Sequence, residues 1–200
     1  MNSQHYSLIL ASSSPYRRAL LSKLHYPFSH ISPSIDETPL AGESPVAMVM
    51  RLAQQKALAV AEQEPQALII GSDQTAVLDN RTLGKPGTRE RAIEQLQATS
   101  GKKVTFLTSL CLLNSVTGRM QTACETFHVH FRQLSRQQIE HYVDIEQPLD
   151  AAGSFKSEGL GIVLFNHLEG RDPNTLVGLP LMKLTDFLRA EGILMPPTPT

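Results

Sequence analysis

The stretch LILASSSPYRRALLSKL, residues 8–24, decides how the chain begins to fold. Its first four residues are apolar and form a run short enough for a buried strand. Three serines follow, and then Pro15, which suits the first position of a helix. Beyond Pro15, apolar residues recur at helical spacing alongside Arg17 and Arg18. The stretch therefore predicts a strand, a serine-rich turn and a helix.

The turn at the start of this helix has the chemistry of an anion site. A helix N-terminus presents unpaired N–H groups and a partial positive charge. Arginine guanidinium groups bind phosphate oxygens two at a time. Ser12, Ser14, Arg17 and Arg18 are therefore candidate phosphate ligands. The alternative is a serine N-cap followed by arginines that face water or pair with a nearby carboxylate.

The composition is that of a globular protein with balanced charge. The chain has 200 residues and a net charge of −1, which suits one domain or one domain of two lobes. The small net charge argues against stable binding to nucleic acid. No run reaches transmembrane length and no signal peptide is recognisable, so we expect a cytoplasmic protein without a membrane partner.

Cysteine and histidine give no clear metal motif. Cys111 and Cys124 lie in apolar, strand-like runs and are expected to be reduced core residues, although they could face each other across a hairpin. His128 and His130 alternate in one such run and share a face. They could form a metal pair, but without a third ligand nearby a polar sheet face is the better interpretation.

The rest of the chain alternates strand and helix signals, which predicts an α/β protein with a mixed sheet. The long hairpin at 104–131 could also pair across a homodimer, and the Pro-rich tail at 195–200 is expected to be disordered. The predicted strands are 26–35, 68–73 (followed by an extended stretch at 75–78), 104–114, 119–131 and 162–165; the helices are 45–62, 88–99, 135–145 and 180–191, with a loop at 166–175.

Three charged residues stand out from their local patterns. Lys56 is the only charge on the apolar stripe of its helix, so its ammonium group either snorkels to the edge of the core or points into a cleft. Asp73 ends an apolar strand, and ligands of α/β proteins bind outside the carboxyl ends of strands. Lys85 lies in a tight loop, where a lysine can also simply face water.

Taken together, the unexplained polar residues indicate phosphate chemistry. The cations and hydroxyls suit a polyphosphate, and the carboxylates suit a divalent metal and a general base. The chain has no GxxxxGK[ST] loop, so it is not a P-loop NTPase. The set comprises Ser12, Ser14, Arg17, Arg18, Asp36, Glu37, Lys56, Asp73, Lys85 and Glu158.

Six motifs in this order resemble the Maf family of nucleoside triphosphate pyrophosphatases. The resemblance extends from Leu8 to about Arg189, and six ordered motifs at consistent spacing are far more specific than any one of them. The motifs are Ala11–Arg18, Asp36–Glu37, Lys56–Ala57, Gly71–Asp73, Gly84–Pro86 and Asp150–Gly159.

The resemblance implies a single Maf-like domain over residues 1–200, with a Maf/Ham1-like two-lobed α/β fold. In such a fold a central, mixed, twisted sheet is flanked by helices, and a nucleotide cleft lies between the lobes. The resemblance also implies hydrolysis of a nucleoside triphosphate to the monophosphate and pyrophosphate with a divalent metal, Mg²⁺ or Mn²⁺. Asp73 matches the catalytic proton acceptor. Asp73 and Glu37 are the predicted metal ligands, and Asp36 is the neighbour that could replace Glu37.

Three positions depart from the commoner members of the family and resemble the subfamily that hydrolyses 7-methyl-GTP. They are Tyr16, Gln74 and Glu158. Methylation at N7 makes guanine cationic, so an aromatic face gains a cation–π attraction of about 1–2 kcal/mol. A carboxylate can accept hydrogen bonds from the guanine N1–H and amino groups. These three residues are the predicted specificity determinants, although Tyr16 could instead pack on its own helix.

Two other functions stay open at the level of sequence. The same class of enzyme could act on dTTP, UTP or another modified nucleotide, in a housecleaning or a regulatory role. The chain could also be a non-enzymatic regulator, because the family has been linked to inhibition of cell division. The intact Glu37, Lys56, Asp73 and Lys85 argue against a protein without activity.

Overall fold

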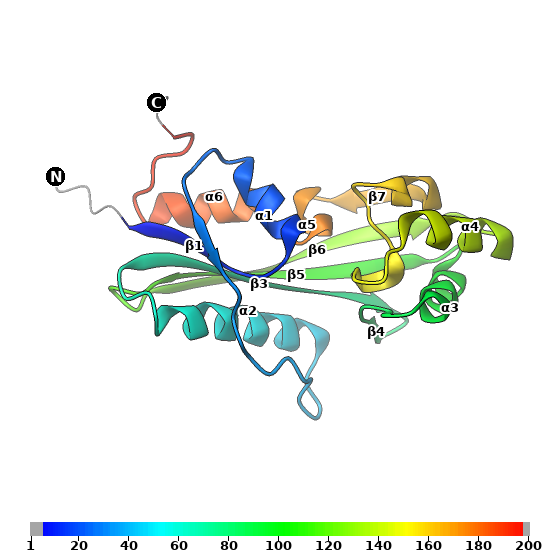
Figure 1. The fold of residues 1–200 in the computed structure, drawn as a ribbon, viewed down its shortest axis with the longest axis horizontal. Coiled ribbons are helices and arrows are strands. Elements are labelled where there is room, and N and C mark those ends of the chain that lie inside the picture. The colour runs from blue at the N-terminus through cyan, green and yellow to red at the C-terminus, as the bar shows by residue number, and fades with distance from the viewer. Residues whose placement is uncertain (1–5, 198–200) are drawn as a thin grey trace. The chain divides into compact units, whose positions relative to one another are not determined.

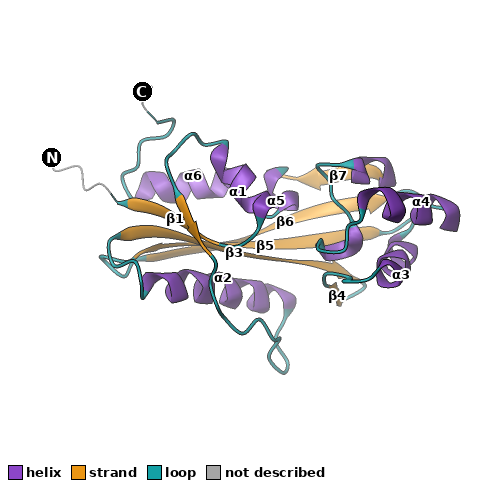
Figure 2. Ribbon diagram, in the orientation of Figure 1, coloured by secondary structure: helices purple, strands orange, loops and turns teal. Residues whose placement is uncertain are grey.

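A computed structural model describes residues 6–197 and gives an α/β fold with a mixed sheet, which confirms the predicted class (Figures 1 and 2). Within residues 6–197 the strand order is β2-β1-β3-β5-β6-β7, and β4 pairs with β3. The strands are β1 Ser7–Ala11, β2 Ser29–Ile31, β3 Ala67–Leu78, β4 Arg81–Leu83, β5 Lys103–Asn114, β6 Met120–Phe131 and β7 Phe165–Gly170. The helices are α1 Pro15–Ser22, α2 Pro45–Ala61, α3 Arg89–Thr99, α4 Arg136–Glu146, α5 Asn174–Val177 and α6 Leu181–Ala190, with 3₁₀ segments η1 Ala152–Ser154 and η2 Leu160–Leu164.

The chain divides into two compact units. Unit 1 comprises Met1–Asp73, Thr108–Glu125 and Gly178–Thr200, and unit 2 comprises Gln74–Leu107 and Thr126–Val177. Strands β3, β5 and β6 contribute residues to both units. Of the Pro-rich tail, residues 195–197 form neither helix nor strand, and residues 198–200 lie outside the described part of the chain.

Unit 1 is built on parallel strands. β1 pairs in parallel with both β2 and β3, and its last residue, Ala11, is opposite Gly71. Helix α2 covers one face of these strands, while α1 and α6 lie on the other face (Figure 1). Burial on both faces explains why β1 and the first half of β3 read as continuous apolar runs in the sequence.

Unit 2 has an antiparallel arrangement. The β3–β4 turn places Asp79 and Asn80 at φ values of 48° and 63°, the left-handed conformation of a tight hairpin turn. Four phenylalanine rings pack edge to face in its core, with centroids 4.7–5.6 Å apart. They are Phe106, Phe131, Phe155 and Phe165.

Two predicted elements near the C-terminus are wrong. The strand expected at 162–165 is the 3₁₀ segment η2 followed by the start of β7, and the loop expected at 166–175 contains most of β7 and the start of α5. β7 is an edge strand with one buried residue, so its sequence lacks the apolar run that marks a central strand. The strand expected at 26–35 shrinks to β2, between Pro27 and Pro33, which have no N–H to donate to a ladder.

Both cysteines are free thiols, with Cys111 buried and Cys124 half-buried. None of the helices within residues 6–197 is long and apolar enough to cross a membrane.

Candidate active site

The turn after β1 forms the predicted helix cap. The Oγ of Ser14 accepts a hydrogen bond from the Arg17 N–H at 3.4 Å, and Pro15 occupies the first helical position. The Ser14 N–H in turn donates to Ser12 Oγ at 3.1 Å. A hydroxyl that accepts a bond can still donate one. Both serine hydroxyls can therefore still donate a hydrogen bond to an anion at the start of α1.

Arg17 is held from within unit 1. Its Nε donates to the carbonyl oxygen of Gly178 at 2.8 Å, and Ser72 Oγ lies 3.0 Å from the same oxygen. Burial lowers the pKa of the Arg17 guanidinium, although the negative charges of Asp73 and Glu37 act in the opposite direction. The side chain remains a cation at any ordinary pH. It thus provides a positioned positive charge that interacts with both predicted metal ligands.

Lys56 is the centre of the site. Its side chain is only 8% exposed, and its Nζ lies 2.6 Å from Asp73 Oδ1 and 2.8 Å from Glu37 Oε1. The snorkelling alternative is therefore wrong, because the ammonium group pairs with two carboxylates instead of reaching for water. Asp73 is nearly as buried, whereas the side chain of Glu37 is 58% exposed.

A glycine explains how Lys56 reaches Asp73. A Cβ at Gly71 would collide with the backbone carbonyl of Ala53 on α2, so the missing side chain lets the helix lie directly on β3. Ala53 is three residues before Lys56, and Gly71 is two residues before Asp73. The close approach of the two backbones therefore sets the distance between the two charged groups.

Ser109, which the sequence reasoning missed, supports the backbone of Asp73. The Asp73 N–H donates to Ser109 Oγ at 3.1 Å, and this hydroxyl lies 2.6 Å from the carbonyl oxygen of Val49 on α2. A hydroxyl is therefore shared between β3, β5 and α2. The sequence did contain a signal that could have identified Ser109, because the polar residues Thr108 and Ser109 interrupt the apolar run of β5.

The carboxylates of Glu37 and Asp73 fit a hard divalent cation. Both reach one ammonium group, so their oxygens converge on the same point, and oxygen donors are the ligands that Mg²⁺ and Mn²⁺ prefer. Asp36 is oriented differently. Its Oδ1 accepts the Thr38 N–H at 2.9 Å, and the hydrogen bonds from Thr38 lower the pKa of the Asp36 carboxyl group. Asp36, the alternative to Glu37 as a metal ligand, is thus part of a local turn.

Of the other predicted site residues, Tyr16 and Arg18 lie on α1, and the rest lie in unit 2. Arg18 is exposed and donates to His30 Nε2 at 2.9 Å, and Tyr16 is half-buried on α1. Lys85 is exposed in the loop after β4. Gln74 donates from Nε2 to the carbonyl oxygens of two residues of α5, at 2.9 and 3.1 Å.

Glu158 belongs to an ordered loop before η2. The Lys156 N–H donates to the hydroxyl of Tyr142 at 3.0 Å, and the Leu160 N–H donates to Glu146 Oε2 at 2.8 Å. Both acceptors come from α4, and burial raises the pKa of the Tyr142 phenol. The sequence singled out neither Tyr142 nor Glu146 as a functional residue. Two contacts from one helix thus fix the loop that presents the exposed Glu158.

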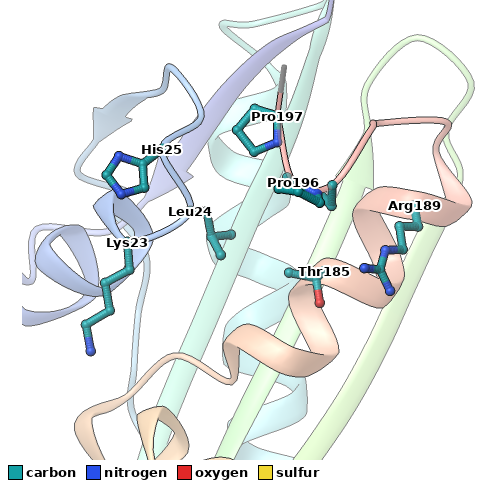
Figure 3. A pocket seen from close by; sticks show the side chains of 8 residues that line it. Lys23, Leu24, His25, Thr185, Arg189, Pro196 and Pro197 are labelled. Carbon is teal, nitrogen blue, oxygen red and sulfur yellow. The ribbon is translucent and has the colours of Figure 1, made fainter. Parts of the chain in front are cut away.

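A surface pocket of about 410 Å³ lies elsewhere in unit 1 (Figure 3). It contains none of the predicted site residues. Its lining comes from the end of α1, from α6 and from the C-terminal segment: Lys23, Leu24, His25, Thr185, Arg189, Met195, Pro196 and Pro197.

Comparison with known proteins agrees with the resemblance found in the sequence. The family model described as Maf-like protein matches residues 7–191. The chain belongs to this family. Among the relatives of this Maf-like protein is a 7-methyl-GTP pyrophosphatase of Alcanivorax borkumensis, 66% identical over 98% of the chain and 100% of the relative. Proteins of the same name from Pseudomonas aeruginosa and Aliivibrio fischeri are 59% and 55% identical, over 94% and 93% of the chain and 98% and 96% of the relatives.

A solved structure supports the fold alone. The Ham1 protein of Staphylococcus aureus superposes with a TM-score of 0.54 at 15% identity, covering 92% of this Maf-like chain and 99% of its own. The Maf/Ham1-like architecture expected from the sequence is therefore confirmed.

Proposed function

We propose that this Maf-like protein hydrolyses 7-methyl-GTP to 7-methyl-GMP and pyrophosphate with the help of a divalent metal. The observation that carries the proposal is the cluster of Lys56, Asp73, Glu37 and Arg17, which joins a buried carboxylate to a converging second carboxylate and two cations. Relatives that are 55–66% identical over nearly the whole chain carry the name 7-methyl-GTP pyrophosphatase, which supports the choice of nucleotide.

The triphosphate would bind at the start of α1. Arg17 and the hydroxyls of Ser12 and Ser14 offer charge and donors there, next to the positive end of the helix. We propose Lys56 as a second phosphate ligand, once its ammonium group shares its carboxylate partners with a metal ion. Arg18 and Lys85 have weaker support, because Arg18 contacts His30 and Lys85 lies in an exposed loop.

Asp73 would act as the general base. Glu37 and Asp73 would hold Mg²⁺ or Mn²⁺, which supplies charge neutralisation for the phosphate oxygens. The Asp73 carboxylate would accept a proton from water as the water oxygen forms a bond to the α-phosphorus. The bond between the α-phosphorus and its bridging oxygen breaks, and pyrophosphate leaves. Lys56 and Ser109 keep the Asp73 side chain and backbone in place during this step.

The methylated base would be recognised by charge. The Tyr16 ring offers a face to the cationic guanine, and the Glu158 carboxylate accepts hydrogen bonds from the N1–H and amino groups. The ordered loop around Glu158 supports this role, because a carboxylate on a fixed backbone loses less conformational freedom on binding. Gln74 is proposed as a positioning residue, since its amide donates to the backbone of α5.

A substrate panel tests the proposal. Purified protein with Mg²⁺ or with Mn²⁺ should release pyrophosphate from 7-methyl-GTP with a higher kcat/KM than from GTP, dTTP or UTP. Faster cleavage of dTTP or UTP would assign the chain to another substrate within the same class of enzyme. No pyrophosphate from any nucleotide would instead favour the non-enzymatic regulator. A cytoplasmic location and a homodimer paired through the β5–β6 hairpin stay predictions.

A further inference from the structure

A histidine pair lies on the neighbouring strands β6 and β7 of unit 2, and neither histidine takes part in the proposed reaction. His130 on β6 is directly opposite His167 on β7, and their ring centroids are 5.2 Å apart. Glu169, two residues along β7, places Oε2 3.4 Å from His130 Nε2. One ligand atom from each of the three residues lies within 4.8 Å of the other two.

The strand pairing makes this cluster. Phe127, Val129 and Phe131 of β6 are buried, so the alternating residue His130 faces outward. A bulge between His130 and Phe131 leaves Asn166 without an opposite residue, because Phe131 pairs with Phe165 and His130 pairs with His167. The bulge therefore returns β7 to a register in which His167 and Glu169 also face outward.

The chemistry of the three donors is that of a transition-metal site. Two imidazole nitrogens and one carboxylate oxygen favour Zn²⁺ or a similar borderline ion over Mg²⁺, whose preferred ligands are oxygens. We propose that His130, His167 and Glu169 form a zinc site that connects the edge strand β7 to β6. All three residues are half-buried or exposed, so an ion can reach them from solvent.

A simple hydrogen bond between His130 and Glu169 would not account for the arrangement. Such a bond needs two of the three residues, and at 3.4 Å it is long. A metal ion would instead use one donor atom from each of the three residues. In the proposed site, the ligands that accompany His130 both come from β7. His128, the partner that the sequence suggested, instead contacts Thr105 through its Nδ1.

Isothermal titration of metal-free, untagged protein with Zn²⁺ alone tests the site. We expect zinc binding that is weakened at least about tenfold in His167→Asn and in Glu169→Gln, since losing even a group that only orients a metal ligand costs about 10- to 100-fold in affinity. His141→Gln is the matched control, because His141 is an exposed histidine on α4 of the same unit. Circular dichroism checks that each variant is folded. If His167→Asn does not fold, the zinc affinity of the conservative variant Glu169→Gln still tests the site.

X-ray absorption at the zinc edge separates this site from the oxygen ligands of Glu37 and Asp73. The proposal predicts two imidazole ligands in the natural chain and fewer than two in His167→Asn. Zinc affinity that is equal in the natural chain and in both folded variants, or a bound zinc without imidazole ligands, would overturn it.

Discussion

Asp73 interacts with residues of three separate elements of unit 1. Lys56 holds one of its carboxylate oxygens, Ser109 accepts its N–H, and Arg17 adds a positive charge. These contacts come from α2, β5 and α1, which are far apart in the sequence. A side chain oriented in this way loses little freedom when a substrate binds, which suits a general base.

Replacing Asp73 by Asn should abolish turnover while sparing nucleotide binding. Asparagine keeps the shape of the side chain but cannot accept a proton, so kcat should fall by about 10²- to 10⁴-fold. The Kd for 7-methyl-GTP without metal should change little. Steady-state kinetics and equilibrium binding measure the two effects, and a kcat equal to that of the natural chain would exclude Asp73 as the base.

Replacing Glu158 by Gln should reduce discrimination rather than catalysis. The variant loses a charge-assisted hydrogen bond to the cationic base, which is about 1.5–3 kcal/mol. The kcat/KM for 7-methyl-GTP should therefore fall by roughly 10- to 100-fold, and that for GTP should fall less, because its base is neutral. Glu90→Gln is the control, since Glu90 is an exposed carboxylate in the first turn of α3. An unchanged ratio in Glu158→Gln would mean that Glu158 does not contact the base.

Cys111 should be inert towards thiol reagents. It is fully buried, and burial raises the pKa of its thiol to about 12. At pH 8 only about one thiol in ten thousand is then ionised, and the thiolate is the reactive form. We expect disulfide-exchange reagents to label Cys124 first and Cys111 only after unfolding. Because the folded pKa is raised, this thiol favours the native state at neutral pH, and that contribution is lost as the pH rises from about 9 towards 12.

At the scale of elements, the contact between α2 and β3 is the least tolerant of change. Gly71→Ala should push α2 away from the strand, because the added Cβ meets the Ala53 carbonyl. Overpacking of this kind costs about 1–3 kcal/mol of unfolding free energy, and kcat should fall because Lys56 moves from Asp73. Gly84→Ala is the control for stability, since nothing lies within 4 Å of a Cβ there. Denaturant unfolding curves that coincide for the natural chain and Gly71→Ala would contradict this account.

The sequence predicted the strongly patterned elements and missed those held by distant contacts. The first residues of α1, α2 and α3 were predicted because a side-chain N-cap precedes each helix. These caps are Ser14, Ser44 and Thr88. β7 was missed because an edge strand with an outward histidine and an outward glutamate has no apolar run. The 3₁₀ segment η2 begins at Leu160, whose N–H donates to Glu146 Oε2, and no local sequence pattern predicts this hydrogen bond.

At the scale of the whole molecule, the order of motifs identified the family and the fold, but not the contacts that build the site. The expected end of a strand at Asp73 marked it as a site residue. That expectation about the strand is wrong, because Asp73 lies within β3, which continues to Leu78. Spacing could not predict that Lys56 pairs with Glu37, or that Ser109 contacts residues 60 and 36 positions away. Such contacts depend on how the helices lie on the sheet, which is a property of packing.

The most direct test of the central claim is a competition between 7-methyl-GTP and GTP, which differ only by the N7 methyl group. Equal concentrations are incubated with the natural chain and Mg²⁺ or Mn²⁺, and the products are separated by chromatography. The account predicts that 7-methyl-GMP and pyrophosphate form first, while GTP remains. Preferential loss of GTP, or release of 7-methyl-GDP with inorganic phosphate, would contradict it.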